Sequence, residues 1–332
     1  MQDSLPVIDV SCFAADEASP TATAIAADLD RALRDTGFVL VAGHGIQAGT
    51  MAALFAEYRR FFALSLADKQ ALAIAKSPQF RGYSGLASEV IDGSSQSLAG
   101  DLKESFDSAR EHAPDHPAVV AGIPLHGPNQ WPSRPEFRAA HDRYLAEGIA
   151  AAERVQRALA VALGMPPGFF LGLGETMYNL RGNYYPAQGE RPRGRWGCSA
   201  HTDYGLMTLL VDDGAPGLQV MHRDGTWRDC TVPAGLVLVN LGDLAAIWTN
   251  DRWVSNPHRV VPATAEERVS IPLFVTPPFF ANVECLPSCL GDGETPRYEP
   301  RLAGPYLLSR FDANYGYRNA LLERHLRGEA SA

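Results

Sequence analysis

The stretch His201-Thr202-Asp203 is the point from which the rest of the sequence can be interpreted. Side chains two positions apart in an extended strand point to the same face, so the imidazole of His201 and the carboxylate of Asp203 can reach one metal ion. A third candidate ligand, His258, follows 57 residues after His201 (258 − 201 = 57). We therefore predict a metal site built from two imidazoles and one carboxylate.

Two histidines and one carboxylate that leave the opposite face of the ion free form the facial triad of non-heme Fe(II) oxygenases. A lone H-x-D motif is weak evidence, because many chains contain one by chance. Arg268 and Ser270, again spaced by two, strengthen the prediction. On one strand face a guanidinium and a hydroxyl can bind a distant carboxylate. The alternative for Arg268 is a surface ion pair with its neighbours Glu266 and Glu267.

The order H-T-D, then H, then R-V-S resembles the isopenicillin N synthase-like branch of the 2-oxoglutarate/Fe(II)-dependent dioxygenases. The segment Asn183-Tyr184-Tyr185-Pro186 is similar to the N-Y-Y-P segment of that family. The stretches Gly37-Phe38 and His44-Gly45-Ile46 resemble its N-terminal region. The resemblance covers roughly residues 5–280 and is weaker beyond them.

This resemblance implies a site and a reaction. Fe(II) would be bound by His201, Asp203 and His258, and 2-oxoglutarate by Arg268 and Ser270, with Tyr185 and Asn183 in support. For Tyr185, a buried tyrosine with a satisfied hydroxyl is the alternative. Dioxygen is the second co-substrate. The implied reaction couples oxidative decarboxylation of 2-oxoglutarate to hydroxylation, or to desaturation or cyclisation, of a small molecule.

Three other functions stay open. The first is a 2-oxoglutarate-independent Fe(II) oxidase of the isopenicillin N synthase type. The second is an ethylene-forming type of enzyme, which residues 126–132 and 200–206 resemble. The third is a non-catalytic binding module. Arg181 could meet an acidic substrate or a neighbouring carboxylate. The predicted substrate contacts, chosen by position, are Tyr83, Phe106, Arg181, Met207, Val220 and Phe279.

The order of expected elements predicts a fold that is mainly β with flanking helices. Residues 1–135 form an N-terminal αβ region that ends in a loop-rich substrate segment; residues 136–332 add a long helix, many short strands and a terminal helix within one structural unit. Short strands of this kind fit a sandwich or jelly roll, and the resemblance implies a cupin-like double-stranded β-helix. A strand is expected at 245–249, and hairpin turns at Asp212-Asp213-Gly214 and Asp224-Gly225.

Composition excludes several classes of protein. A formal net charge of −9 gives no electrostatic reason to bind nucleic acid or an anionic membrane. No apolar run approaches the length needed to span a bilayer, and the first residues lack the pattern of a signal peptide. The five scattered cysteines suggest reduced thiols; Cys285 and Cys289 resemble a zinc half-site without a second half. We therefore expect a soluble, cytoplasmic enzyme with a small-molecule substrate; its oligomeric state is not predicted.

Overall fold

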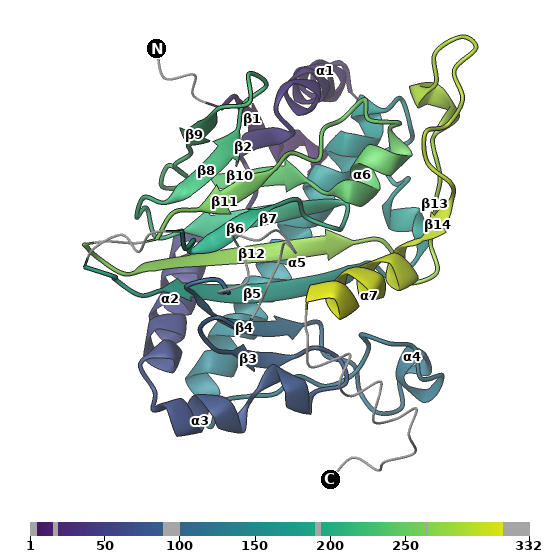
Figure 1. Ribbon diagram of the computed structural model, residues 1–332. Helices are drawn as coiled ribbons and strands as arrows, with labels where there is room; N and C mark the ends of the chain where they lie inside the picture. Colours follow the sequence, from purple (N-terminus) through teal and green to yellow (C-terminus); the bar gives the residue numbers. More distant parts are fainter. Residues whose placement is uncertain (1–4, 16–18, 89–99, 190–193, 263–264, 315–332) are drawn as a thin grey trace.

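The computed structural model describes residues 5–15, 19–88, 100–189, 194–262 and 265–314 (Figure 1). Its core consists of a large sheet with strand order β1-β2-β10-β7-β12-β5-β4-β3 and a small sheet with order β6-β11-β8-β9. Almost every pairing is antiparallel; β1 with β2 is parallel. Helices flank these sheets, so the predicted mainly-β fold with a jelly-roll core is confirmed.

The strands are short, as the spacing of apolar runs and turns predicts. The large sheet contains β1 (Val7–Asp9), β2 (Phe38–Ala42), β3 (Gly82–Ser84), β4 (Glu104–Ala109), β5 (Met177–Tyr185), β7 (Met207–Asp212), β10 (Val237–Leu241) and β12 (Arg268–Thr276). The small sheet contains β6 (Cys198–His201), β8 (Leu218–Met221), β9 (Trp227–Asp229) and β11 (His258–Val260). A separate pair, β13 (Asn282–Val283) and β14 (Arg301–Leu302), lies outside both sheets.

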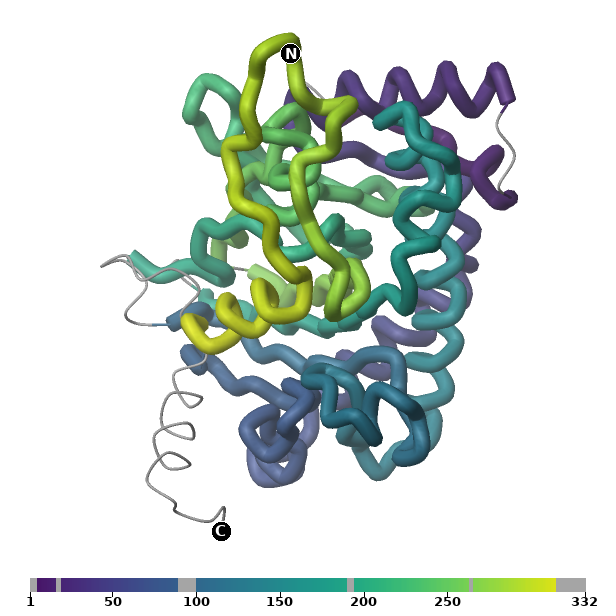
Figure 2. The backbone as a smooth tube through the Cα atoms, turned by 90° about the vertical axis from the view of Figure 1, so that its right-hand side faces the viewer, coloured from purple at the N-terminus to yellow at the C-terminus, as the bar shows by residue number. Residues whose placement is uncertain are grey.

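One face of the large sheet is covered by α1 (Pro20–Asp35), α2 (Ala48–Phe62) and α5 (Pro135–Ala162), and α5 runs behind the strands (Figures 1 and 2). The sequence determines where α1 begins, because the side chain of Ser19 caps this helix by accepting from the N–H of Ala22. Close packing demands a glycine where α2 meets β5. A Cβ on Gly182 would lie 2.3 Å from the ring of Tyr58.

The other face of the large sheet meets the small sheet and forms a second apolar core. Its buried members come from both sheets: Phe38, Leu40, Tyr185, Cys198, Leu218, Val220, Leu238 and Val260. Because side chains alternate along a strand, every second residue of β5 and β12 points into this space. This is the space in which the predicted site residues of those strands lie.

The segment 79–135 contains more regular structure than its composition suggests. Its two ordered-looking stretches are β3 and β4, which extend the large sheet from β5. A short helix, α4 (Pro117–Val120), follows, and α3 (Leu66–Ala71) precedes the segment. Strand β4 is buried along its whole length, although its sequence of mostly polar residues does not predict a buried strand.

Two local predictions need correction. Residues 245–249, expected as a strand, lie largely in helix α6 (Asp243–Trp248), which starts after Gly242 and is buried on all sides, so its apolar run carries no helical period. Asp212-Asp213-Gly214 does not close a hairpin; it leads from β7 in the large sheet to β8 in the small one. The predicted terminal helix, expected over residues 306–326, is present as α7 (Ala303–Asn314), and the remainder of that range lies outside the described residues.

The Asp224-Gly225 turn does join an antiparallel pair, β8 and β9. His44 has a structural role, as its sequence context suggests: its Nδ1 accepts from the N–H of Ile46, and its Nε2 lies 3.1 Å from the carbonyl of Gly235.

Among the described helices, none has the length and apolarity that crossing a membrane requires.

Candidate metal and co-substrate site

The three predicted metal ligands converge between the two sheets. His201 ends β6, and His258 begins β11 directly opposite it in the antiparallel pair. Their rings lie 4.3 Å apart between centroids. Asp203 follows β6 and places Oδ1 3.9 Å from Nε2 of His201 and 3.8 Å from Nε2 of His258. Two atoms that each lie about 2.1 Å from one ion can be no more than about 4.2 Å apart, so these separations allow a shared ion.

The hydrogen bonds of both imidazoles leave Nε2 free. Nδ1 of His201 lies 2.8 Å from the carbonyl oxygen of Ser199, and Nδ1 of His258 lies 3.3 Å from that of Asn256. A carbonyl oxygen only accepts, so Nδ1 carries the proton in each ring and Nε2 carries the lone pair. Outer hydrogen bonds of this kind fix the tautomer and the orientation of metal-binding histidines.

The two carboxylate oxygens of Asp203 have different partners. Its Oδ2 accepts hydrogen bonds from Oγ1 of Thr208 and Nδ2 of Asn240, both at 2.6 Å. Its Oδ1 faces the two Nε2 atoms and is left to the metal. Burial by itself would raise the pKa of Asp203, but His258, His201 and these hydrogen bonds outweigh burial and lower that pKa. The carboxylate is therefore ionised at neutral pH.

Burial and the neighbouring His201 lower the pKa of His258 to about 4. Its ring is therefore neutral at pH 7. A neutral imidazole beside an ionised carboxylate is in the protonation state that a divalent metal needs from its ligands. The residues present thus fit a divalent ion by position, by tautomer and by charge.

Arg268 is the clearest candidate for binding an anion in the same cavity. It is only 1% exposed, which excludes the surface ion pair considered as its alternative. It donates through Nη2 to Oδ2 of Asp212 at 3.0 Å and through Nε to the carbonyl of Ala215 at 3.2 Å. Its Nη1 is buried and has no partner among the residues that the structure describes. Buried donors are rarely left unpaired, so this atom points to a missing acceptor.

The other predicted co-substrate residues lie beside Arg268. In the pairing of β12 with β5, Arg268 is opposite Tyr185 and Ser270 is opposite Asn183. The guanidinium carbon of Arg268 lies 5.2 Å from the centre of the Tyr185 ring. Burial raises the pKa of Tyr185, so its hydroxyl keeps its proton. One cavity contains all four of these residues together with the metal triad.

Lys103 is a site residue that the sequence analysis missed. It is buried at the start of the β4 region and lines the cavity that contains Arg268 and the triad. Its Nζ lies 3.2 Å from Oδ2 of Asp101 and 3.3 Å from the thiol of Cys198. Oδ1 of Asp101 in turn accepts from the N–H and the hydroxyl of Ser199, two residues before His201. No motif spacing links Lys103 to the triad, because strand pairing brings them together.

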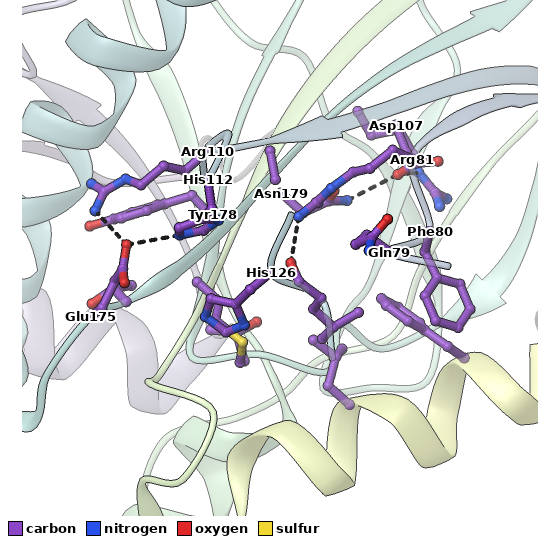
Figure 3. Close-up of a pocket in the computed structure, with 18 residues that line it drawn as sticks. Gln79, Phe80, Arg81, Asp107, Arg110, His112, His126, Glu175, Tyr178 and Asn179 are labelled. Carbon is purple, nitrogen blue, oxygen red and sulfur yellow. Dashed lines mark hydrogen bonds and ion pairs between the residues drawn. The ribbon is translucent and has the colours of Figure 1, made fainter. Parts of the chain in front are cut away.

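A second cavity adjoins the triad and continues away from it. Asn179, Arg181, Thr276, Leu307 and Phe311 line both the cavity beside His201 and a further one, drawn in Figure 3. Within the further cavity, Nε of Arg181 donates to Oδ1 of Asp107 at 2.9 Å. The buried Arg81 donates to Asn179 and to the carbonyl of Leu125. These cavities provide space for a substrate next to the metal position.

Arg181 lines these cavities, but the structure places the other five predicted substrate contacts elsewhere. Tyr83 is buried and donates its hydroxyl to Glu104, and Phe106 packs against Phe61 and Phe137 in the main core. Met207 belongs to the same core, while Val220 packs in the core between the sheets. Phe279 packs in a small cluster with Phe80 and Leu125. In the described structure these five side chains pack in apolar clusters and do not line the three cavities, and their role as substrate contacts stays a prediction.

The five cysteines are all free, as their odd, scattered pattern predicts. Among the described residues, two groups of His, Cys, Asp or Glu side chains are close enough to hold a metal ion. One is the triad, and the other is His112, His126 and Glu175. Cys285 and Cys289 belong to neither group, so the zinc half-site has no support.

Comparison with known proteins finds two family models that together match most of the chain. Residues 5–134 match the family model described as non-haem dioxygenase in morphine synthesis N-terminal. Residues 177–277 match the model of the 2OG-Fe(II) oxygenase superfamily. The second match contains the triad and the Arg268–Ser270 pair.

Individual relatives cover nearly the whole chain. The 2-oxoglutarate-Fe(II) type oxidoreductase hxnY of Emericella nidulans is 33% identical over 96% of this chain and 94% of its own length. A homoarginine-6-hydroxylase of Arabidopsis thaliana is 31% identical over 94% of this chain and 98% of its own length. Among solved structures, that of a full-length Neurospora crassa protein in complex with alpha-KG and thymine has a TM-score of 0.79 and 28% identity, covering 94% of this chain and 98% of that one.

Proposed function

This chain belongs to the 2-oxoglutarate–Fe(II) oxygenase superfamily, and on that premise we propose which residues carry its reaction and what kind of substrate it takes. The protein is a 2-oxoglutarate- and Fe(II)-dependent dioxygenase. We assign Fe(II) to His201, Asp203 and His258. The observation that carries this assignment is the convergence of two Nε2 lone pairs and one carboxylate oxygen, with the unpaired Nη1 of Arg268 in the same cavity.

The cavity also fits the co-substrate. The C5 carboxylate of 2-oxoglutarate would accept from Nη1 of Arg268 and from the hydroxyl of Ser270, with Tyr185 beside them. A buried carboxylate needs such a cationic partner, because an unpaired charge there is costly. We assign Asn183, which is opposite Ser270 in the β12–β5 pairing and lines the same cavity, to the C1 end. Fe(II), when bound, supplies the activation of dioxygen; the protein supplies binding, orientation and exclusion of water.

The substrate that these cavities favour is a small molecule with an acidic group. The residues that line the further cavity include the three guanidinium groups of Arg81, Arg110 and Arg181 and the two carboxylates of Asp107 and Glu175. Positive charge therefore exceeds negative charge on these walls, and a substrate carboxylate would balance it. Hydroxylation of this substrate is the outcome we propose, with desaturation or cyclisation as variants that need only a different placement of the reacting carbon.

Substrate-stimulated release of succinate from 2-oxoglutarate tests this function. We expect Fe(II)-dependent succinate release that rises with small carboxylic acids and not with their primary amides, because the amides carry no charge for Arg181. Turnover that proceeds without 2-oxoglutarate would contradict the assignment and favour an oxidase of the isopenicillin N synthase type. Ethylene in the headspace, measured by gas chromatography, would instead indicate an ethylene-forming enzyme. Stimulation by the amides alone would refute the acidic substrate while leaving the reaction class intact.

Lys103 should support binding of 2-oxoglutarate. Replacing Lys103 with methionine leaves the Asp101 carboxylate without its cation at the wall of the co-substrate cavity. We expect the apparent KM for 2-oxoglutarate to rise roughly tenfold, equivalent to about 1.4 kcal/mol. Lys69→Met is the matched control, because Lys69 also forms a buried ion pair, with Glu104, but lines none of the described cavities. Both variants should lose stability; an equal change in KM in both would show that Lys103 has no specific role.

The proposed compartment is the cytoplasm. The five free cysteines suit a reducing environment, in which thiols stay unpaired. Fractionation of cells that express the protein, followed by immunoblotting, tests this placement.

A further inference from the structure

We propose that His112, His126 and Glu175 form a second metal site, distinct from the iron triad, which binds a divalent ion of the zinc type. Each of the three residues offers one ligand atom, and these atoms lie within 4.8 Å of one another. The residues come from three separate segments: the end of the β4 region, the loop after α4 and the residues before β5. They meet at one end of the further cavity (Figure 3).

The hydrogen bonds of His126 prepare it as a ligand. Its Nδ1 lies 2.9 Å from the carbonyl oxygen of Pro124, which can only accept. The proton therefore sits on Nδ1, and Nε2 has its lone pair free. This is the arrangement that both triad histidines show, with a backbone carbonyl that fixes the tautomer.

His112 and Glu175 complete the set. His112 is 9% exposed, and its Nε2 lies 3.1 Å from Oε1 of Glu175. Since a carboxylate oxygen only accepts, Nε2 carries the proton of this ring, and the lone pair lies on Nδ1, which is buried and has no partner among the described residues. Buried polar atoms of this kind usually indicate an unfilled role, such as binding an ion.

His116 lies next to this group but has a different role. Its Nδ1 accepts from the N–H of Ala118 at the start of α4, so its proton sits on Nε2, which faces Oε2 of Glu175 at 3.6 Å. A protonated nitrogen donates and does not coordinate. His116 therefore orients the carboxylate of Glu175, and a substitution of His116 serves as a control for substitutions of the proposed ligands.

Two imidazoles and one carboxylate favour a borderline divalent ion such as Zn²⁺ or Co²⁺ over Mg²⁺ or Ca²⁺, which prefer oxygen ligands. Three protein ligands leave at least one coordination position open, as in catalytic zinc sites. The cavity that these residues line shares Asn179 and Arg181 with the cavity beside His201. A bound ion would thus present its open position to the far end of the proposed substrate space.

The guanidinium of Arg110 opposes binding of a cation. It donates to Oε1 of Glu175 at 3.3 Å and places a positive charge beside the proposed ion. Removing this charge should strengthen metal binding, while removing a ligand should weaken it. The two opposite effects distinguish a metal site from a cluster of polar groups that only stabilises the fold.

Co²⁺ and Zn²⁺ titrations of the full chain test the proposal. The metal-free Asp203→Asn protein, in which the triad is disabled, should bind one equivalent, measured by equilibrium dialysis and by the visible absorption of Co²⁺. Adding His112→Ala or His126→Ala should weaken this binding by at least about 100-fold, because loss of even an outer partner of a ligand costs 10–100-fold. Arg110→Gln should strengthen it, and His116→Asn, which retains a good helix cap, should leave the stoichiometry unchanged.

Two results would overturn the proposal. One is an Asp203→Asn protein that binds no ion beyond the background of a non-binding control protein. The other is an Asp203→Asn protein that still binds one equivalent of Co²⁺ or Zn²⁺ when His112 and His126 are both replaced, with the fold verified by circular dichroism. Neither result bears on the iron triad, since wild-type protein would still bind one equivalent of Fe(II) and release succinate.

Discussion

We expect Asp203→Asn to abolish iron binding and all substrate-dependent succinate release while leaving the fold intact. Thr208 and Asn240 both donate to Oδ2 of Asp203. In the variant these two donors hold the amide oxygen, so the amide NH₂ group faces the two Nε2 atoms of the histidines. A group that only donates hydrogen bonds cannot coordinate Fe(II). The affinity for Fe(II) should fall by more than about 100-fold, because loss of a residue that only hydrogen-bonds to a metal ligand already costs about 10–100-fold.

Asparagine is a sharper substitution here than alanine. Alanine would leave Thr208 and Asn240 buried without an acceptor, which costs about 1–3 kcal/mol for each group and confuses loss of metal with loss of stability. Asparagine retains both hydrogen bonds. Anaerobic Fe(II) titration, succinate release and circular dichroism together measure the effect, with Asp229→Asn, at an exposed residue of strand β9, as the control. Measurable turnover in Asp203→Asn would show that Asp203 is not an iron ligand.

The sequence predicts those parts of the site that a single strand or turn brings together. His201 and Asp203 are two residues apart, as are Arg268 and Ser270, and local geometry decides which side chains meet. His258 is distant in sequence, and only a family pattern connects it to the other two. The pairing of β11 with β6 then brings it directly opposite His201.

Other features depend on contacts that no local pattern encodes. Lys103 enters the co-substrate cavity because β4 pairs with β5, a partner about 80 residues further along the chain. His112, His126 and Glu175 likewise meet only after three segments are placed around one cavity. The error at residues 245–249 has a different cause. A short helix buried on every side shows an unbroken apolar run, which periodicity cannot distinguish from a buried strand.

Substrate contacts are harder to predict from a sequence than metal ligands, for a physical reason. Aromatic residues such as Tyr83 and Phe106 fill cores and line pockets with equal ease, and their neighbours in sequence do not indicate which. Arg181 differs, because its strand partner Asp107 holds the guanidinium at the cavity wall. Charged side chains that are buried need partners, so their positions are better determined than those of apolar ones.

Replacing Arg268 with alanine should raise the apparent KM for 2-oxoglutarate by about 30-fold to several thousand-fold. These values correspond to the 2–5 kcal/mol that loss of one partner of a buried charge pair costs. Iron binding should stay unchanged, because Arg268 is not a ligand. Turnover at saturating 2-oxoglutarate should change much less than KM, since the residue binds a part of the co-substrate that does not react.

Asp212 makes this prediction more specific. In Arg268→Ala its carboxylate loses the cation that lies 3.0 Å away and remains buried near the carboxylate of 2-oxoglutarate. Burial already raises the pKa of Asp212 in spite of Arg268. The double variant Arg268→Ala/Asp212→Asn removes this repelling charge and should recover part of the lost affinity. Titration of succinate release against 2-oxoglutarate measures all three proteins. Equal KM values for wild type and Arg268→Ala would show that the free Nη1 binds something other than the co-substrate.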